Sequence, residues 1–328
     1  MAEGFNITDV RFAGDSATDY MITRATIGLD TIDNNCIMVK TDVKKAFNIP
    51  RMVITNIFQK RNATPTSQGS ITIDGNVITP LYYNAYTEYN PNDLREYWLA
   101  YQLPTRIIDA TLPQTFEGYL IDIYLKQVNQ NNEFMLWRGR LAFDPANGGL
   151  DPATKNQDAG DSVYMYYDGL IKLLLADAGT IKPSFTTLTE STILAAMDLI
   201  YSYVPQALIN HPNLRFLMNR TTWRLYQGAL TNNTFKDNQT TEGTKMAYKG
   251  MEIVPLGGMP DQTIVCCIST GDNTSALWLG CNSADDSNAV LIDKTVNASE
   301  LWFIKIMMNA AVQFGFSQEI VLYTNITN

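Results

Sequence analysis

Histidine and cysteine, which most often carry nucleophilic or metal chemistry, are scarce in this sequence. The one histidine, His211, directly precedes a proline, so we expect it in a loop rather than in a zinc motif or a catalytic triad. Of the four cysteines, Cys266 and Cys267 are adjacent, Cys36 and Cys281 are remote, and none has CxxC spacing. Adjacent cysteines in an apolar run are typical of a buried strand, so we predict no metal or redox site.

Carboxylates offer the other route to acid–base or metal chemistry. Asp285 and Asp286 are adjacent, and further carboxylates lie in a long polar loop over residues 144–161. Their spacing does not match a calcium-binding loop, and a glycosidase would need two of them to converge in space. Phosphate-binding glycine loops and a nucleophile elbow are also missing from the sequence. We therefore assign no catalytic, cofactor-binding or metal-ligating residue, and predict neither enzyme activity nor a cofactor.

Two clusters of side chains are suited to binding. Arg51, Lys60 and Arg61 form a basic group, which we interpret as a solvated or inter-subunit patch rather than a nucleic-acid site. The second cluster is aromatic and resembles a platform for carbohydrates or bases, although we favour buried packing for it. Its members are Tyr82, Tyr83, Tyr86, Tyr89, Tyr97 and Trp98.

The composition indicates a chain that folds but is short of charge. Hydrophobic residues make up 45% of its 328 residues, enough for a core, while charged residues make up only 17%. A surface poor in charge and rich in Asn and Thr hints at extensive cover by neighbouring subunits. The net charge of -9 argues against a protein whose main task is to grip duplex DNA. The sequence contains no apolar run long enough to span a membrane and no recognisable signal peptide.

The N-terminal part of the chain predicts an arm followed by a projecting hairpin. Residues 1–47 alternate weakly and are expected to be an extended arm rather than a packed element. Next, alternating isoleucines and Val77 flank an Asp-Gly-Asn sequence at 74–76, which is typical of a turn between two paired strands. The polar loop over 60–69 has no core of its own, so the hairpin must lie either on the rest of this chain or on a neighbour.

The middle of the chain predicts helices and its end predicts strands, which makes the fold α+β. A capping box formed by Thr111 and Gln114 opens an amphipathic helix over 112–131, with an extension to Trp137 as the alternative. Further helices are expected at 162–177, 190–203 and 220–230, and strands at 214–219, 251–255, 263–268, 275–281, 290–292, 301–312 and 318–323.

This order of elements resembles the major capsid proteins of tailed bacteriophages, which have the Hong Kong 97 type of fold. Individual stretches are similar to capsid proteins of phages that infect Bacteroidetes, and together they cover nearly the whole chain. They correspond to the E-loop (48–65) and its return (83–98), the spine helix (111–130) and the segment after it (148–175), the axial domain (214–230, 248–267 and 271–280) and the last strands (300–324). The specificity of the match comes from their order and number.

The resemblance implies five parts within this α+β fold. They are an N-terminal arm (1–47), an E-loop hairpin (48–92), a peripheral domain with the spine helix (93–180), an axial domain (181–297) and C-terminal strands that return to the peripheral domain (298–328). Some family members crosslink an E-loop lysine to an asparagine of a neighbouring subunit. Lys60 is the conceivable donor here, while the partner asparagine and the assisting glutamate have no matching motif.

The resemblance also implies a structural function. Such subunits self-assemble as pentamers and hexamers into an icosahedral shell around a double-stranded DNA genome, so we expect the chain in the virion after assembly in a bacterial cytoplasm. Expected partners are copies of this chain, a separate scaffolding protein, a portal protein and decoration proteins, with weak contact to packaged DNA and none to a membrane. The alternatives are a glycan-binding or glycan-cleaving protein that uses the aromatic cluster Tyr82–Trp98, and another virion component such as a tail or decoration protein.

Overall fold

The chain divides into two units, which are described separately. The computed structural model describes residues 30–54, 57–61, 63–64, 66–67, 69–89, 116–141, 166–232, 247–282, 290–295 and 301–326. Unit 1 holds the described parts of 82–132 and 282–309, and unit 2 holds those of 30–81, 133–281 and 310–326. The described helices are α2 (Asp30–Asp33), α4 (Phe116–Arg138), α5 (Leu170–Ala176), α6 (Ile193–Tyr203), α7 (Arg220–Asn232) and the 3-10 turn η4 (Ser317–Glu319).

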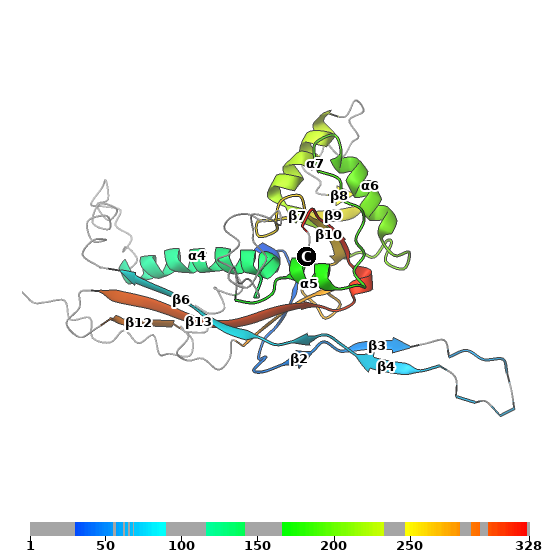
Figure 1. Cartoon of the computed structure of the whole chain (residues 1–328), viewed down its shortest axis with the longest axis horizontal. Coiled ribbons are helices and arrows are strands. Elements are labelled where there is room, and N and C mark those ends of the chain that lie inside the picture. The colour runs from blue at the N-terminus through cyan, green and yellow to red at the C-terminus, as the bar shows by residue number, and fades with distance from the viewer. Residues whose placement is uncertain are drawn as a thin grey trace, which may run out of the picture. The chain divides into compact units, whose positions relative to one another are not determined.

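The described strands form two larger sheets and a long two-stranded hairpin (Figure 1). Strands of the N-terminal part are β1 (Met38–Lys40), β2 (Phe47–Asn48), β3 (Arg51–Ile54), β4 (Ile71–Asp74), β5 (Val77–Ile78) and β6 (Leu81–Tyr89). Those of the C-terminal part are β7 (Leu214–Asn219), β8 (Ala247–Tyr248), β9 (Met251–Leu256), β10 (Ile264–Ile268), β11 (Leu277–Cys281), β12 (Val290–Lys294), β13 (Trp302–Phe314) and β14 (Val321–Tyr323). The α+β class predicted from the sequence is confirmed.

The main core of unit 2 lies between a five-stranded sheet and the helices α6 and α7. The strand order is β14-β10-β7-β9-β8, with β7 and β9 parallel and β10 antiparallel to β7. Every residue of the inner strand β10 is buried, which explains its unbroken apolar sequence. Phe216 of β7, Met197 of α6 and Tyr226 of α7 belong to one buried cluster, and Figure 1 shows both helices over this sheet. The predicted buried strand around Cys266 and Cys267 is therefore confirmed.

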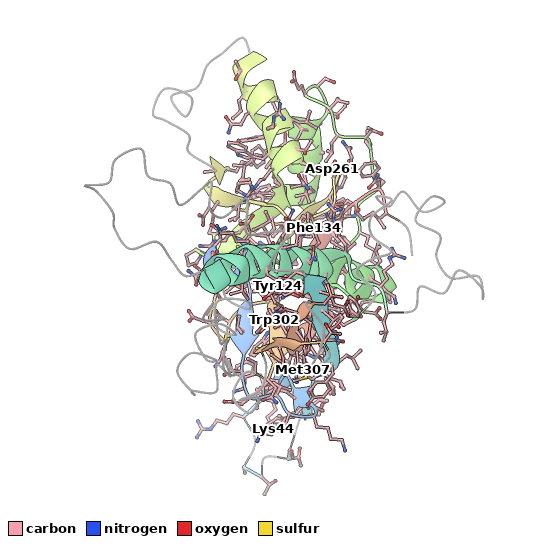
Figure 2. All side chains as sticks on the ribbon, turned by 90° about the vertical axis from the view of Figure 1, so that its left-hand side faces the viewer. Lys44, Tyr124, Phe134, Asp261, Trp302 and Met307 are labelled. Carbon is pink, nitrogen blue, oxygen red and sulfur yellow. The ribbon has the colours of Figure 1, made fainter. Side chains whose placement is uncertain are left out.

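Unit 1 is a small sheet with one helix against it. The first part of β13 pairs with β12 and with β6, and the helix α4 covers one face of these strands. Leu125 and Val128 of α4 pack against Ile304 and Ile306 of β13 in a small buried cluster. In Figure 2, Tyr124 lies on the side of α4 that is turned towards this strand.

The N-terminal segment differs from the extended arm that the sequence predicts. Residues 30–47 are part of unit 2, where Cys36, Ile37 and Val43 are buried and β1 pairs in parallel with β11. The weak alternation misled because these buried residues lie in the connections before and after β1 rather than in one regular element. Residues 1–29 lie outside the described residues.

The hairpin prediction placed its turn at the wrong residues. Strands β4 and β5, on either side of Gly75, do not pair with each other: β4 pairs with β3 and β5 pairs with β2, both antiparallel. The Asp-Gly-Asn sequence therefore lies within one arm of a longer hairpin, whose turn falls between β3 and β4. The glycine is required for close packing, because a side chain at Gly75 would overlap the carbonyl oxygen of Ile49.

Helix boundaries also shift in instructive ways. The helix predicted over 112–131 is α4, which begins at Phe116 and extends to Arg138, while its predicted capping box lies outside the described residues. The helix predicted over 162–177 begins only at Leu170, because Gly169 meets Gly139 backbone to backbone and donates its N–H to that carbonyl at 2.8 Å. The sequence also offers Thr221 or Thr222 as the cap of the helix predicted over 220–230. Helix α7 begins at Arg220, and its cap is instead the side chain of Asn219, which accepts the N–H of Thr221 at 2.7 Å.

Candidate assembly interface

The two-stranded ribbon β3–β4 has one apolar face. In its register Met52 lies opposite Ile73 and Ile54 lies opposite Ile71, so these four side chains share one side of the ribbon. The other side carries Val53 opposite Thr72. The four apolar side chains are 54% to 68% exposed, although such residues are usually buried. This side, called the apolar ribbon face below, is the largest departure from ordinary burial within the ribbon.

The base of the ribbon is fixed to the core of unit 2. Ile49 and Ile78 are buried and pack with Trp278 of β11. The Ile49 N–H donates to the carbonyl of Asn76 at 2.9 Å, and the side chain of Asn76 donates to the carbonyl of Phe314 at 2.8 Å. The ribbon therefore starts from a base that is packed into unit 2, and Figure 1 shows β3 and β4 projecting from that base.

The described residues beyond the ribbon continue its exposed apolar character and add positive charge. Ile57 and Phe58 are exposed at 55% and 87%, and Lys60 and Arg61 are exposed as well. Arg51 lies at the other end of β3, with its guanidinium 5.6 Å from the ring centre of Phe316. The structure thus separates the three residues of the predicted basic cluster, because Arg51 belongs to the base and the other two to the far loop. It does not test the crosslinking role conceived for Lys60.

The predicted aromatic cluster is divided between the two faces of β6. Tyr82 and Tyr86 are exposed, and Tyr86 packs on Phe303 of β13 with ring centres 5.6 Å apart. Tyr83 donates to Asn132 of α4 at 3.0 Å, and Tyr89 packs against the buried cluster beneath α4. The described tyrosines therefore do not form one platform, and half of them serve the packing that the sequence favours. The remaining members, Tyr97 and Trp98, lie outside the described residues.

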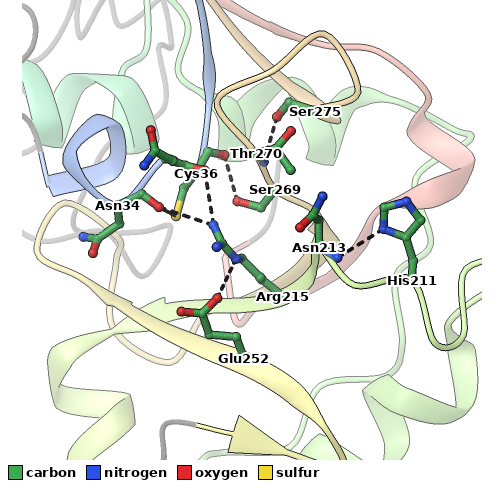
Figure 3. Close-up of polar contacts among 10 residues, drawn as sticks. Asn34, Cys36, His211, Asn213, Arg215, Glu252, Ser269, Thr270 and Ser275 are labelled. Carbon is green, nitrogen blue, oxygen red and sulfur yellow. Dashed lines mark hydrogen bonds and ion pairs between the residues drawn. The ribbon is translucent and has the colours of Figure 1, made fainter.

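The structure shows where the histidine and the cysteines considered in the sequence lie. His211 lies in a turn, where its Nδ1 accepts the N–H of Asn213 at 3.2 Å, as drawn in Figure 3. Burial raises the pKa of the Cys266 thiol to about 12, so this cysteine stays protonated and unreactive at neutral pH. Within the described ranges no three His, Cys, Asp or Glu residues gather as a metal site. The carboxylates at 144–161 and at 285–286 fall outside those ranges.

Membrane insertion through a helix finds no support in the described part of the chain. None of the helices there combines the length and the apolar character that crossing a bilayer requires.

The sequence missed the apolar ribbon face because its two halves are separated along the chain. The signal was present as two short runs, the continuous apolar run Met-Val-Ile at 52–54 and the alternating run Ile-Thr-Ile at 71–73. What the sequence lacked was the register that places the two runs side by side. The turn signal at 74–76 also pointed to the wrong pairing.

Comparisons with known proteins give a match through structure but not through sequence. No protein-family model and no curated protein matches the chain. Among solved structures, the chain is similar to the satellite phage P4 procapsid including size determination (Sid) protein, with a TM-score of 0.58 and 12% identity over 100% of this chain and 93% of that chain. It is also similar to the capsid of a native GTA particle, with a TM-score of 0.55 and 13% identity over 92% of this chain and 90% of that chain.

A third similar structure is the capsid of Myoviridae phage XM1, with a TM-score of 0.53 and 11% identity over 90% of this chain and 91% of that chain. These three matches each cover nine tenths or more of both chains, so they concern the whole architecture rather than a shared motif. The narrower expectation, of phages that infect Bacteroidetes, stays a prediction. The chain has the fold of tailed-phage capsid proteins.

Proposed function

We propose that this chain is the major capsid protein of a tailed phage, which self-assembles as pentamers and hexamers into an icosahedral shell around double-stranded DNA. The observation that carries the proposal is the combination of a capsid fold with an apolar ribbon face that unit 2 leaves exposed. Fully burying one large aliphatic side chain is worth about 1.5 to 3 kcal/mol, so four of them favour association by several kcal/mol. In a protein that stayed monomeric, the exposed apolar side chains of the ribbon would add no stability.

The ribbon supports association in rings. A ribbon that docks on a different surface of the next copy makes a heterologous contact, and such contacts close into rings when the rotation allows it. The exposed sheet face of unit 1, with Tyr82, Tyr86 and Leu291, is an apolar surface that a second copy can cover. Neighbouring copies are thus the first partners that the proposal requires.

The remaining partners follow from the proposed role. A shell of this kind needs a scaffolding protein during assembly and a portal for DNA entry, and its surface can carry decoration proteins. The net charge of -9 suits a shell that contacts its packaged DNA weakly and without sequence preference. The proposed location is the virion, with assembly in the cytoplasm of the bacterial host, and the proposed role includes no enzymatic step.

Light scattering and negative-stain electron microscopy of the full chain, with and without a scaffolding protein, test the proposal. Pentamers, hexamers, tubes or closed shells are the expected products. A stable monomer under all conditions, scaffolding protein present, would contradict the capsid function and favour the glycan-binding alternative. Trimers, or rings with a subunit number other than five or six, would instead favour another virion component.

A further inference from the structure

A buried carboxylate joins the helical turn α2 to the end of helix α4 within unit 2. Glu133 of α4 is only 5% exposed, and it accepts two hydrogen bonds from Thr31, which is fully buried. The Thr31 N–H donates to Oε2 at 3.2 Å and the Thr31 hydroxyl donates to Oε1 at 2.5 Å. The indole N–H of Trp137, one turn further along α4, donates to the Thr31 hydroxyl oxygen at 2.9 Å.

The loop after β9 closes this junction from a third side. Gly258 lies so close to Glu133 that an added Cβ would stand 2.5 Å from the Glu133 carbonyl oxygen and 2.7 Å from its Cγ. Arg138 donates to the carbonyls of Gly258 at 3.1 Å and Met259 at 2.9 Å, which fixes the loop against α4. The carboxylate is thus enclosed by α2, α4 and this loop, in which Gly258 packs so closely that there is no room for a side chain.

The charged groups around Glu133 do not offset its negative charge. Its hydrogen-bond donors, the backbone and hydroxyl of Thr31, are neutral. On α2, Asp30 and Asp33 add negative charge, and Asp30 accepts from Arg220 of α7 at 2.6 Å and from the Gly257 N–H at 3.2 Å. Arg138 of the same helix donates to the loop carbonyls of Gly258 and Met259. Burial raises the pKa of Glu133 to about 7. The two hydrogen bonds from Thr31 favour the ionised form and oppose this rise, while the negative charge of Asp30 adds a smaller contribution to it.

A second set of contacts holds the far end of the same segment and does not involve Glu133. Arg215 of β7 donates to the carbonyls of Asn34 at 3.3 Å and Asn35 at 3.2 Å, and pairs with Glu252 of β9 at 2.7 Å. Ser269 donates to the carbonyl of Cys36 at 2.8 Å. Figure 3 shows these residues around Arg215. Segment 30–36 is therefore held at one end by the carboxyl group of Glu133 and at the other end by Arg215 and Ser269.

We propose that Glu133 is a proton-operated latch for segment 30–36, which is held more firmly when the carboxyl group is protonated and is loosened when it ionises. The physical reason is linkage. Opening of the segment exposes the carboxyl group to water, where it recovers its ordinary acidity, so the closed form binds the proton more tightly than the open form. This inference concerns the subunit itself and does not depend on the proposed capsid function.

The direction of the pH dependence follows from the direction of the pKa shift of Glu133. The closed form has the raised pKa, so protons favour closure between the ordinary pKa of a glutamate and about 7. Above that range the closed form must hold a buried negative charge, and the free energy of local opening is at its lowest. The latch is therefore tight in mild acid and loose at and above neutral pH.

Amide hydrogen exchange of the unassembled full chain tests this latch. The exchange of residues 30–36 is measured between pH 5 and 7.5 and corrected for the intrinsic dependence of exchange on pH. The opening constant of this segment in the wild-type chain is expected to rise roughly 50-fold over that range. Amides of β10, which is buried on both faces, serve as the internal control for global unfolding.

Glu133→Gln is the decisive variant, because it keeps the shape and a hydrogen-bond acceptor but cannot ionise. Its opening constant for segment 30–36 is expected to be constant within twofold from pH 5 to 7.5. Asp30→Asn is the matched control: it removes the ion pair with Arg220 and loosens the segment at every pH, yet keeps the dependence on pH.

Two outcomes would overturn the latch. The first is an unchanged pH dependence in Glu133→Gln, and the second is a wild-type dependence of equal size in segment 30–36 and in β10. If Glu133→Gln does not fold, infrared difference spectra of the wild-type chain decide the matter. Loss of the carbonyl band of a buried protonated carboxyl group between pH 6 and 8 supports the latch, and absence of that loss contradicts it.

Discussion

The ribbon β3–β4 and the strand β10 are both rich in isoleucine and valine, yet they meet opposite environments. Every residue of β10 is buried by strands on both sides and by the helices above. In the ribbon, Ile71 and Ile73 are 64% and 68% exposed. The same residue types thus serve an internal core in one region and an external surface in the other. Under the proposed function the ribbon is buried by a second molecule, whereas β10 is buried within one chain.

The largest effect on the isolated chain is expected from the internal core. Phe216→Ala on β7 removes a side chain that is 0% exposed, and should lower the free energy of unfolding by about 3 to 5 kcal/mol. Urea denaturation followed by tryptophan fluorescence measures the change. A loss below 1 kcal/mol would mean that the sheet beneath α6 and α7 is not the core on which unit 2 depends.

The second effect tests whether stability in this packed region depends on pH. Because the raised pKa of Glu133 belongs to the folded state, stability should fall by about 3 kcal/mol as pH rises from 4.5 to 7. Denaturation midpoints measured across this range should show that slope in the wild-type chain and lose it in Glu133→Gln. A slope of opposite sign would show that Glu133 is more acidic in the folded chain than in the unfolded chain.

A smaller effect is expected where the ribbon joins the core. Gly75→Ala places a methyl group against the carbonyl of Ile49, so the backbone of the base must shift at a cost of about 1 to 3 kcal/mol. The matched control is Gly315→Ala, where an added Cβ meets its nearest neighbour at an ordinary 3.8 Å. Thermal unfolding of both variants should separate them by several degrees, and equal melting temperatures would show that the base tolerates strain.

The smallest effect is expected on the ribbon itself. Ile73→Ala should change the unfolding free energy of the isolated chain by less than about 0.5 kcal/mol, because the side chain is already mostly exposed. Denaturation of the monomer measures this. A loss comparable to that of Phe216→Ala would show that the isoleucine is covered by its own chain in solution.

The C-terminal half was predictable from the sequence because its elements are set by local pattern. The strand at 264–268 is an unbroken apolar run, and the helix over 220–232 follows a clear change from apolar strand to mixed residues, so both were placed within a few residues. The long helix was also found from its periodicity, and it extends beyond residue 131 to Arg138. These signals lie within single stretches of chain.

The features that the sequence did not predict depend on contacts between residues that are distant along the chain. Gly75 was taken as a turn glycine, but its reason is the carbonyl of Ile49 on the neighbouring strand. Thr31 and Glu133 are 102 residues apart, and no local pattern marks either as a partner of the other. The apolar ribbon face likewise needs the register between β3 and β4 before its four residues form one surface.

The most direct test of the account compares the two sides of the ribbon. Sedimentation velocity is run on the wild-type chain, on Ile71→Asn with Ile73→Asn, and on the control Val53→Asn with Thr72→Asn from the opposite side, each with and without scaffolding protein. We predict large assemblies for the wild type and the control, and a folded monomer for the isoleucine double variant. Equal assembly of both double variants, or a wild-type chain that remains monomeric throughout, would contradict the claim that neighbouring copies bury the apolar ribbon face.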